Sequence, residues 1–250
     1  MVATAIHAGH ALRDEIASLI QLSELDRLRE EDPFTDRWVG IAGNRIVAHR
    51  SRFEVDLNRP RERAMYRTPA DAWGLDLWKL APPDDVVARS LELYDSFYAT
   101  LGRICDDIIE ANGHVVVLDL HSYNHHRAGP AAPVDDPMDN PEINLGTESI
   151  HRPGWEAVVE AFADALGAPP FYVAKLDVRF DVRFTGGHMV RWLNDRYGSR
   201  CCAIAVEVKK IYMDEWTGKL DEEITATIGG LLESADHAVR GTLSERKATH

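Results

Sequence analysis

Two unbroken apolar segments constrain the fold of this chain more than any other feature. The strand expected at residues 114–120 has a Val-Val-Val-Leu centre, and the strand expected at residues 203–208 reads Ala-Ile-Ala-Val-Glu-Val. Strands without polar alternation are typical of parallel or mixed sheets that are covered on both faces. Both segments are far shorter than the roughly 20 apolar residues of a membrane-spanning helix. They therefore predict the centre of a buried sheet.

Helical and strand patterns alternate around these two segments. An apolar stripe predicts a long helix from residue 82 to the Asn112-Gly113 pair, and shorter helices are expected within residues 12–28, 155–166, 188–194 and 222–238. Short strands are expected at residues 3–6, 46–48, 55–57 and 171–174, and a long irregular loop at residues 127–153. The alternation predicts one domain over residues 1–250, a three-layer α/β/α fold with a mixed, largely parallel central sheet.

The charge balance excludes several classes of partner. The chain has 28 basic and 41 acidic residues, which give a formal net charge of −13. Nucleic acids and anionic membranes would be repelled by such a surface, so we expect neither as a partner. Three cysteines form no obvious disulfide framework, and Met1 begins no charged-then-apolar leader. We therefore expect a soluble, cytoplasmic protein, whose oligomeric state the sequence does not predict.

Histidines follow two of the expected strands. His7 and His10 lie three residues apart after the first strand, and His121 follows the strand at residues 114–120. Open α/β sheets place their sites at such strand ends, and neutral imidazoles are common zinc ligands. Asp119, two residues before His121, could orient that histidine as a ligand. The pattern indicates a metal site, although an HxxH pair in a chain with 11 histidines also arises by coincidence.

Two further clusters could act on a substrate. Glu207 lies near the end of an otherwise apolar strand, where a carboxylate must be paired, hydrogen-bonded or protonated. It could be a structural ion-pair partner or a general base that activates a metal-bound water. Arg52, Asn58 and Arg59 could together grip a carboxylate, although each arginine could equally form a surface salt bridge.

These segments resemble the zinc carboxypeptidases and, more closely, the N-formylglutamate amidohydrolase family, which shares their fold. Residues 55–59 resemble the carboxypeptidase VDLNR segment, residues 120–123 the HSY segment, and residues 206–207 the strand of the catalytic glutamate. Residues 6–9 and 29–36 are similar to the amidohydrolase histidine-glycine start and spaced-aspartate segment, and residues 184–187 and 212–215 also look like family segments. The order of these motifs agrees along the chain.

The resemblance implies a metal-dependent amidohydrolase, with Zn²⁺ or another divalent transition metal as its cofactor. It implies His7 and His121 as ligands and leaves His10 and Asp32 as alternatives for the third position. Glu207 would be the general base, and Arg52, Asn58 and Arg59 would hold the carboxylate of a small N-formyl or N-acyl amino acid substrate. A metallopeptidase, or an inactive binding or regulatory domain on the same fold, are the alternatives. Extra histidines after residue 119 and the tail from residue 216 suggest a divergent branch.

Overall fold

A mixed six-stranded sheet forms the centre of the computed structural model, which describes residues 1–172 and 174–248. The strand order is β2-β1-β3-β8-β4-β7, and all neighbours are parallel except β4 and β8. A small hairpin, β5 and β6, lies apart from this sheet. The strands are β1 (Val2–Ala5), β2 (Asn44–Val47), β3 (Val115–Tyr123), β4 (Ile143–Gly146), β5 (Pro170–Phe171), β6 (Ala174–Lys175), β7 (Val178–Phe180) and β8 (Cys201–Lys209).

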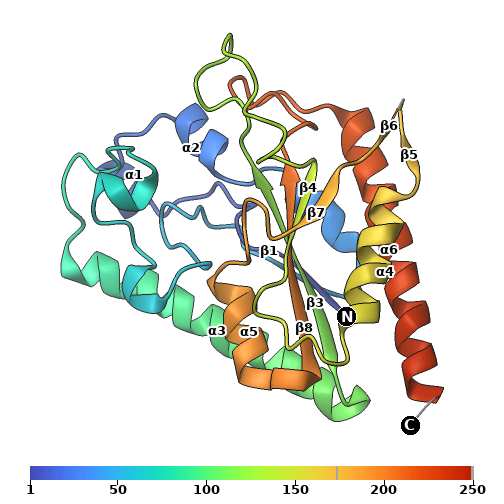
Figure 1. Cartoon of the computed structure of the whole chain (residues 1–250). Helices are drawn as coiled ribbons and strands as arrows, with labels where there is room; N and C mark the ends of the chain where they lie inside the picture. Colours follow the sequence, from blue (N-terminus) through green and yellow to red (C-terminus); the bar gives the residue numbers. More distant parts are fainter. Residues whose placement is uncertain (173, 249–250) are drawn as a thin grey trace.

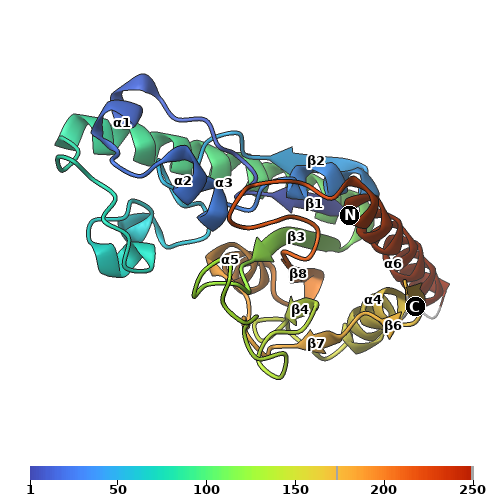
Figure 2. The same ribbon diagram turned by 90° about the horizontal axis from the view of Figure 1, so that it is seen from above.

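Helices cover both faces of the sheet (Figure 1). The long helix α3 (Asp84–Asn112) lies with α5 (His188–Tyr197) on one face, and α4 (Glu156–Gly167) lies with α6 (Glu222–Ala248) on the other. The view from above shows the same separation (Figure 2). Short helices lie in the connections: α1 (Asp14–Leu19), α2 (Glu24–Glu30), η1 (Thr35–Ile41), η2 (Arg61–Arg63), η3 (Pro69–Ala72) and η4 (Gly198–Arg200). The predicted three-layer fold is confirmed.

The two central strands explain how the fold builds a site. Successive side chains of a strand point to opposite faces. In β3, Val116 and Leu118 pack in the apolar cluster under α4 and α6, whereas Val115 and Val117 pack in the cluster under α3. Near the carboxyl ends of β3 and β8, the side chains on the face towards α3 are polar but still buried. They include Asp119, His121 and Glu207. The sheet therefore supplies rigid, buried supports for polar side chains at one edge.

Four local predictions were wrong. The strand expected at residues 171–174, of which residue 173 lies outside the described residues, is replaced by the two-residue strands β5 and β6, which pair antiparallel. The helical pattern in residues 12–28 forms two short helices, because the Ser23 hydroxyl accepts from the Asp26 N–H at 3.1 Å and begins α2 anew. Residues 55–57 form no strand: residues 55 and 56 are irregular, residue 57 begins a turn, and the Asp56 N–H donates to the Ala64 carbonyl at 2.7 Å. Residues 127–153 contain the buried strand β4, which is too short to show periodicity in the sequence.

The long helix α3 ends where the sequence predicted. Gly113 has a φ of 81°, and its N–H donates to the Ile109 carbonyl. A left-handed residue of this kind is readily supplied by glycine, which lacks a Cβ. The chain therefore turns sharply from α3 into β3.

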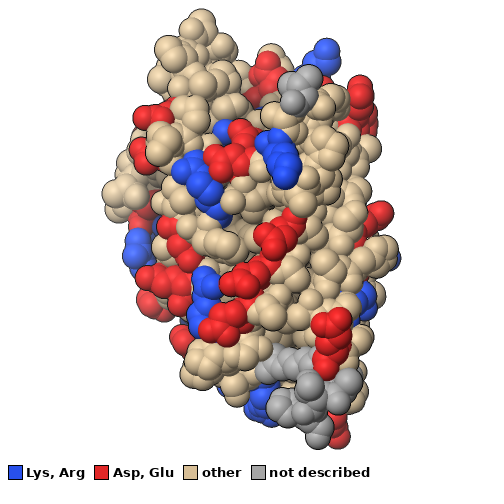
Figure 3. Space-filling model, turned by 45° about the vertical axis from the view of Figure 1, so that its right-hand side comes forward, with Lys and Arg blue, Asp and Glu red and all other residues tan. Residues whose placement is uncertain are grey.

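The outer surface carries interspersed charges. On the face shown in Figure 3, acidic side chains alternate with basic ones, and the coloured residues form no continuous basic area. Within residues 1–172 and 174–248, no helix is long and apolar enough to cross a membrane. The expected absence of a nucleic-acid partner stays a prediction.

Candidate metal centre and catalytic cavity

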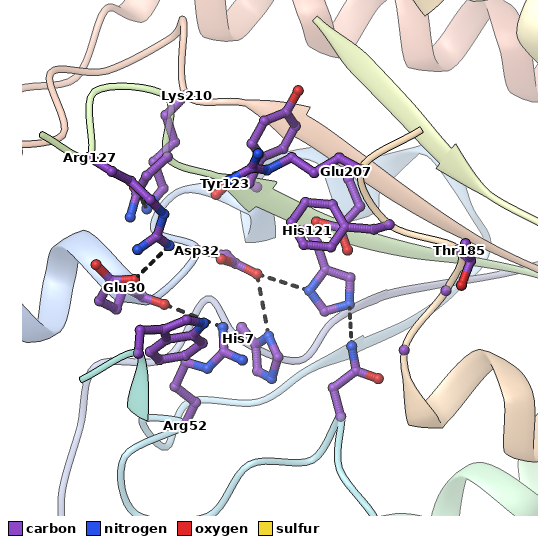
Figure 4. A pocket seen from close by; sticks show the side chains of 18 of the residues that line it. His7, Glu30, Asp32, Arg52, His121, Tyr123, Arg127, Thr185, Glu207 and Lys210 are labelled. Atoms are coloured by element: carbon purple, nitrogen blue, oxygen red, sulfur yellow. Dashed lines mark hydrogen bonds and ion pairs between the residues drawn. The ribbon is translucent and has the colours of Figure 1, made fainter. Parts of the chain in front are cut away.

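Three buried side chains converge at the carboxyl edge of the sheet: His7, Asp32 and His121. Their possible ligand atoms all lie within 4.8 Å of one another. His7 follows β1 and His121 lies in the neighbouring parallel strand β3, so the two strand ends bring them together. The Asp32 N–H donates to the His7 carbonyl at 3.0 Å, which fixes Asp32 beside them. The Asp32 Oδ2 lies 2.9 Å from the His121 Nδ1 and 3.4 Å from the His7 Nδ1 (Figure 4).

Each histidine also contacts a carboxylate through its other ring nitrogen, Nε2. The His7 Nε2 lies 2.7 Å from the Asp56 Oδ1, and the His121 Nε2 lies 2.7 Å from the Asp119 Oδ2. The Thr4 hydroxyl donates to the other oxygen of Asp119 at 2.7 Å. Carboxylates at this position fix the orientation of metal-binding imidazoles and raise their basicity. Both rings therefore present their Nδ1 atoms towards Asp32.

The local charges fit a divalent cation. The His7 Nδ1 is buried and has no hydrogen-bond partner among the described residues. Burial alone would raise the pKa of Asp32, but the hydrogen bond from His121 and the charges of both imidazoles lower it well below its usual range. Burial would likewise lower the pKa of His121, but the charges of Asp119 and Glu207 raise it. Two imidazoles and one carboxylate match the three protein ligands of a catalytic zinc site.

His10, the other predicted third ligand, points elsewhere. Its Nδ1 lies 2.5 Å from the Glu31 Oε2, and its Nε2 lies 3.0 Å from the Arg27 Nη2. Its side chain is 38% exposed, whereas those of His7 and His121 are only 2% exposed. The cluster therefore contains Asp32 and leaves His10 in a separate polar network.

Glu207 lies beside this cluster on β8. In the parallel ladder it is the register partner of His121 on β3. Burial raises the pKa of Glu207 to about 7, and the nearby charges of Asp32 and Asp119 also raise it. A carboxyl group with a pKa near the working pH can both take and return a proton. A bound cation would favour its ionised form.

A cavity of about 400 Å³ opens over these residues (Figure 4). His7, Asp32, His121 and Glu207 lie in its wall. Five cationic side chains also line it, although the chain as a whole is acidic. Sites for small molecules have volumes of roughly 300–1,000 Å³. The volume of the cavity lies within this range, and its lining carries more cationic than acidic side chains.

Sequence comparison decides the family. The sequence profile of N-formylglutamate amidohydrolase matches residues 1–213. The chain belongs to this family. Among curated proteins, none matches its sequence significantly.

The first two solved structures below share the fold of this amidohydrolase, and the third matches it only weakly. The N-formylglutamate amidohydrolase of Ralstonia eutropha JMP134 is 17% identical, with a TM-score of 0.72 over 96% of this chain and 94% of that one. A gene product of Agrobacterium tumefaciens is 16% identical, with a TM-score of 0.60 over 98% and 91% of the two chains. A metallo-carboxypeptidase from Burkholderia cenocepacia is 17% identical, with a TM-score of 0.36 over 96% and 56%.

Arg52 and Asn58 line the cavity of this amidohydrolase, but both already have partners. The Arg52 Nη2 donates to the Asp56 Oδ2 at 3.0 Å, and its guanidinium stacks 4.7 Å from the centre of the Trp73 ring. The Asn58 Oδ1 accepts from the Met189 N–H at 3.0 Å and so caps the start of α5. The Asn58 amide nitrogen lies 3.4 Å from the His121 Nε2.

Arg59 lies outside the residues that line this cavity. Its guanidinium stacks 4.4 Å from the centre of the Tyr66 ring, and its Nη2 donates to the Asp71 carbonyl at 2.6 Å. Its Nε lies 3.5 Å from the Asp56 Oδ2. These contacts support the wall around Asp56, and a role in holding the substrate carboxylate stays a prediction.

Several residues of the site were missed in the sequence. Asp56, which contacts His7, was not predicted as a site residue. The signal for it was its position within the motif at residues 55–59, two residues before Asn58. The cavity also includes Lys210 and Arg183, which no motif singled out. Arg183 stands just before the family segment at residues 184–187, and only the folding of that loop over the sheet brings it to the cavity.

Proposed function

We propose that this amidohydrolase is metal-dependent and hydrolyses the amide bond of a small N-formyl or N-acyl amino acid. One observation carries the proposal: His7, Asp32 and His121 form a buried ligand set beside Glu207 at the base of a small cavity. When bound, Zn²⁺ or a similar divalent cation supplies Lewis acidity, which polarises a carbonyl group and acidifies water. His7, Asp32 and His121 would hold that cation.

Glu207 would carry the proton. Its carboxylate takes a proton from the attacking water, and the resulting carboxylic acid gives a proton to the leaving amine. The pKa of about 7 that burial produces at this position supports both roles. Asp56 and Asp119 hold the two imidazoles in place, so that the ligands need little rearrangement when the cation binds.

The size of the cavity favours a small amide over a peptide. A volume of about 400 Å³ stands near the lower end of the usual range for small-molecule sites. The cationic lining agrees with a carboxylate on the substrate. Arg52 and Asn58 would contact the substrate from the wall next to His7 and His121, and Arg59 would support that wall.

The test combines metal analysis with a substrate screen. Purified protein is analysed for metal, reloaded with Zn²⁺, and assayed for free amine with N-formyl amino acids, N-acetyl amino acids and dipeptides. We expect about one metal ion per chain and turnover of an N-formyl or N-acyl amino acid. Turnover of dipeptides alone, or of no compound at all, would contradict the proposal.

A matched pair of variants tests the base. Glu207→Gln keeps the size of the side chain but removes its basicity, so turnover should fall at least ~10²–10⁴-fold while metal stays bound. Glu142→Gln is the control, because Glu142 pairs with Lys209 at 3.2 Å and does not line the cavity. Equal turnover in both variants would assign Glu207 a structural role.

A further inference from the structure

The cations that line the cavity differ in how far their charge is already neutralised. Two of them face a carboxylate directly. Arg52 donates to Asp56 at 3.0 Å, and Arg127 donates to Glu30 at 3.0 Å. Each of these pairs is close to neutral as a unit, so it attracts an anion only weakly.

Two more cations also have partners. The Arg191 Nη2 lies 3.6 Å from the Glu148 Oε2 and donates to the Thr185 hydroxyl at 2.9 Å. The buried Lys210 ammonium donates to three oxygens, which fills its three N–H positions. These acceptors are the Arg29 carbonyl, the Glu31 carbonyl and the Asn124 Oδ1, at 2.5, 2.8 and 2.9 Å.

Arg183 is different. Within residues 1–172 and 174–248, its side chain has no ion pair and no hydrogen bond, and its Nε is buried without an acceptor. Its guanidinium lies 5.4 Å from the centre of the Tyr123 ring and 5.6 Å from that of the Phe184 ring. A buried donor without a partner is costly, and a carboxylate oxygen would satisfy both the donor and the charge.

The loop that carries Arg183 is held by hydrogen bonds to Asn144, which lies on β4 next to Glu207 on β8. The Asn144 Oδ1 accepts from the backbone N–H groups of residues 182, 183 and 184 at 3.1, 2.9 and 3.4 Å. The Asn144 amide in turn donates to the Phe184 carbonyl at 2.7 Å. Asn144 is fully buried on β4, where it is the register partner of Glu207 on β8. The loop is therefore held in place before any ligand binds.

We propose that Arg183 binds a carboxylate of the substrate and so selects acids over the matching amides. This inference rests on the proposed function and assigns the recognition of charge to a residue outside the Arg52 to Arg59 segment. Arg183 combines a free charge, an unsatisfied donor and a fixed loop. In the Arg52 to Arg59 segment, by contrast, Arg52 is paired and Arg59 lies outside the cavity lining.

The kinetic test compares Arg183→Met with wild type on N-formylglutamate and on its α-amide and γ-amide. The substitution should lower kcat/KM for N-formylglutamate by about ten- to a hundredfold, mainly through KM. One of the two amides should be poor with wild type and lose less than about threefold with Arg183→Met. Arg183→Lys should recover part of the loss, because it keeps the charge without the planar fork. Equal losses on all three compounds would overturn the proposal.

A control variant separates the role of Arg183 from general charge. Arg179→Met removes one positive charge four residues before Arg183, from a side chain that does not line the cavity and pairs with Asp177 at 3.0 Å, so its loss on N-formylglutamate should stay under about threefold. Metal content and melting temperature should match wild type in both variants. If Arg179→Met loses as much activity as Arg183→Met, the effect comes from the overall positive charge and the assignment of Arg183 is wrong.

Binding is measured separately from turnover. N-formylglutamate is titrated into Zn²⁺-loaded Glu207→Gln and into the Glu207→Gln, Arg183→Met double variant. Arg183 should account for at least a tenfold difference in Kd. If wild type hydrolyses nothing but this difference appears, the proposed function fails and the Arg183 assignment stands. Equal Kd values, or no binding to either variant, overturn the assignment.

Discussion

At the scale of single residues, the identity of the third metal ligand can be decided by two substitutions. The Asp32 Oδ2 lies 2.9 Å from the His121 Nδ1 and 3.4 Å from the His7 Nδ1. Both ring nitrogens of His10 instead contact side chains outside this cluster. We expect Asp32→Ala to lose stoichiometric metal, because two imidazoles alone form an incomplete site. His10→Ala should keep about one metal ion per chain. Metal analysis after dialysis measures both, and the reverse result would return His10 to the site.

At the scale of elements, Lys210 joins the end of β8 to the end of α2. Its ammonium contacts the Arg29 and Glu31 carbonyls just before Asp32, and burial lowers its pKa to about 8. Lys210→Met would leave these acceptors without a donor, at a cost of about 1–3 kcal/mol in the free energy of unfolding. Urea denaturation of metal-free protein measures this cost.

Lys209 provides the matched control for this element. It is the last residue of β8, directly before Lys210, and its ammonium pairs with the partly exposed Glu142 at 3.2 Å. Lys209→Met should cost at most about 1 kcal/mol, as partly solvated ion pairs usually do. If both substitutions destabilise the protein equally, the bonds of Lys210 to the α2 carbonyls do not explain its burial.

At the scale of the whole molecule, metal binding should stabilise the fold. The three candidate ligands lie just after β1, on β3 and just after α2, so a bound cation links parts of the chain far apart in sequence. Free metal at 100 times its Kd adds about 2.7 kcal/mol to the free energy of unfolding. For a chain of this size, each kcal/mol raises Tm by roughly 2–4 °C.

Chelation should therefore lower Tm by about 5–11 °C, as measured by calorimetry with and without a chelator. His7→Ala is the control, because its Tm should not respond to the chelator. An unchanged Tm in chelated wild-type protein would contradict binding at this site. A large shift in His7→Ala would place the metal elsewhere.

The sequence by itself determined the layers of the fold. It also determined the two site residues that lie at the ends of buried strands, His121 and Glu207. Unbroken apolar runs fixed β3 and β8, and His121 and Glu207 follow from those runs because strand geometry holds their side chains at known positions. Gly113 likewise marked the end of α3 through its left-handed backbone. Such features depend on local patterns, which a single sequence displays.

Only the tertiary structure brings Asp32 beside His7 and His121 and leaves His10 outside this cluster, and only it places Arg183 in the cavity lining and Arg59 outside it. Asp32 enters the site through one backbone hydrogen bond to His7, and Arg183 through the hold of Asn144 on its loop. Both contacts join residues 25 or more positions apart, and Asp32 and Arg183 themselves lie in irregular segments without periodicity. The physical reason is that loop backbones are positioned by buried polar groups far away in the chain, and these partners leave no pattern in the local sequence.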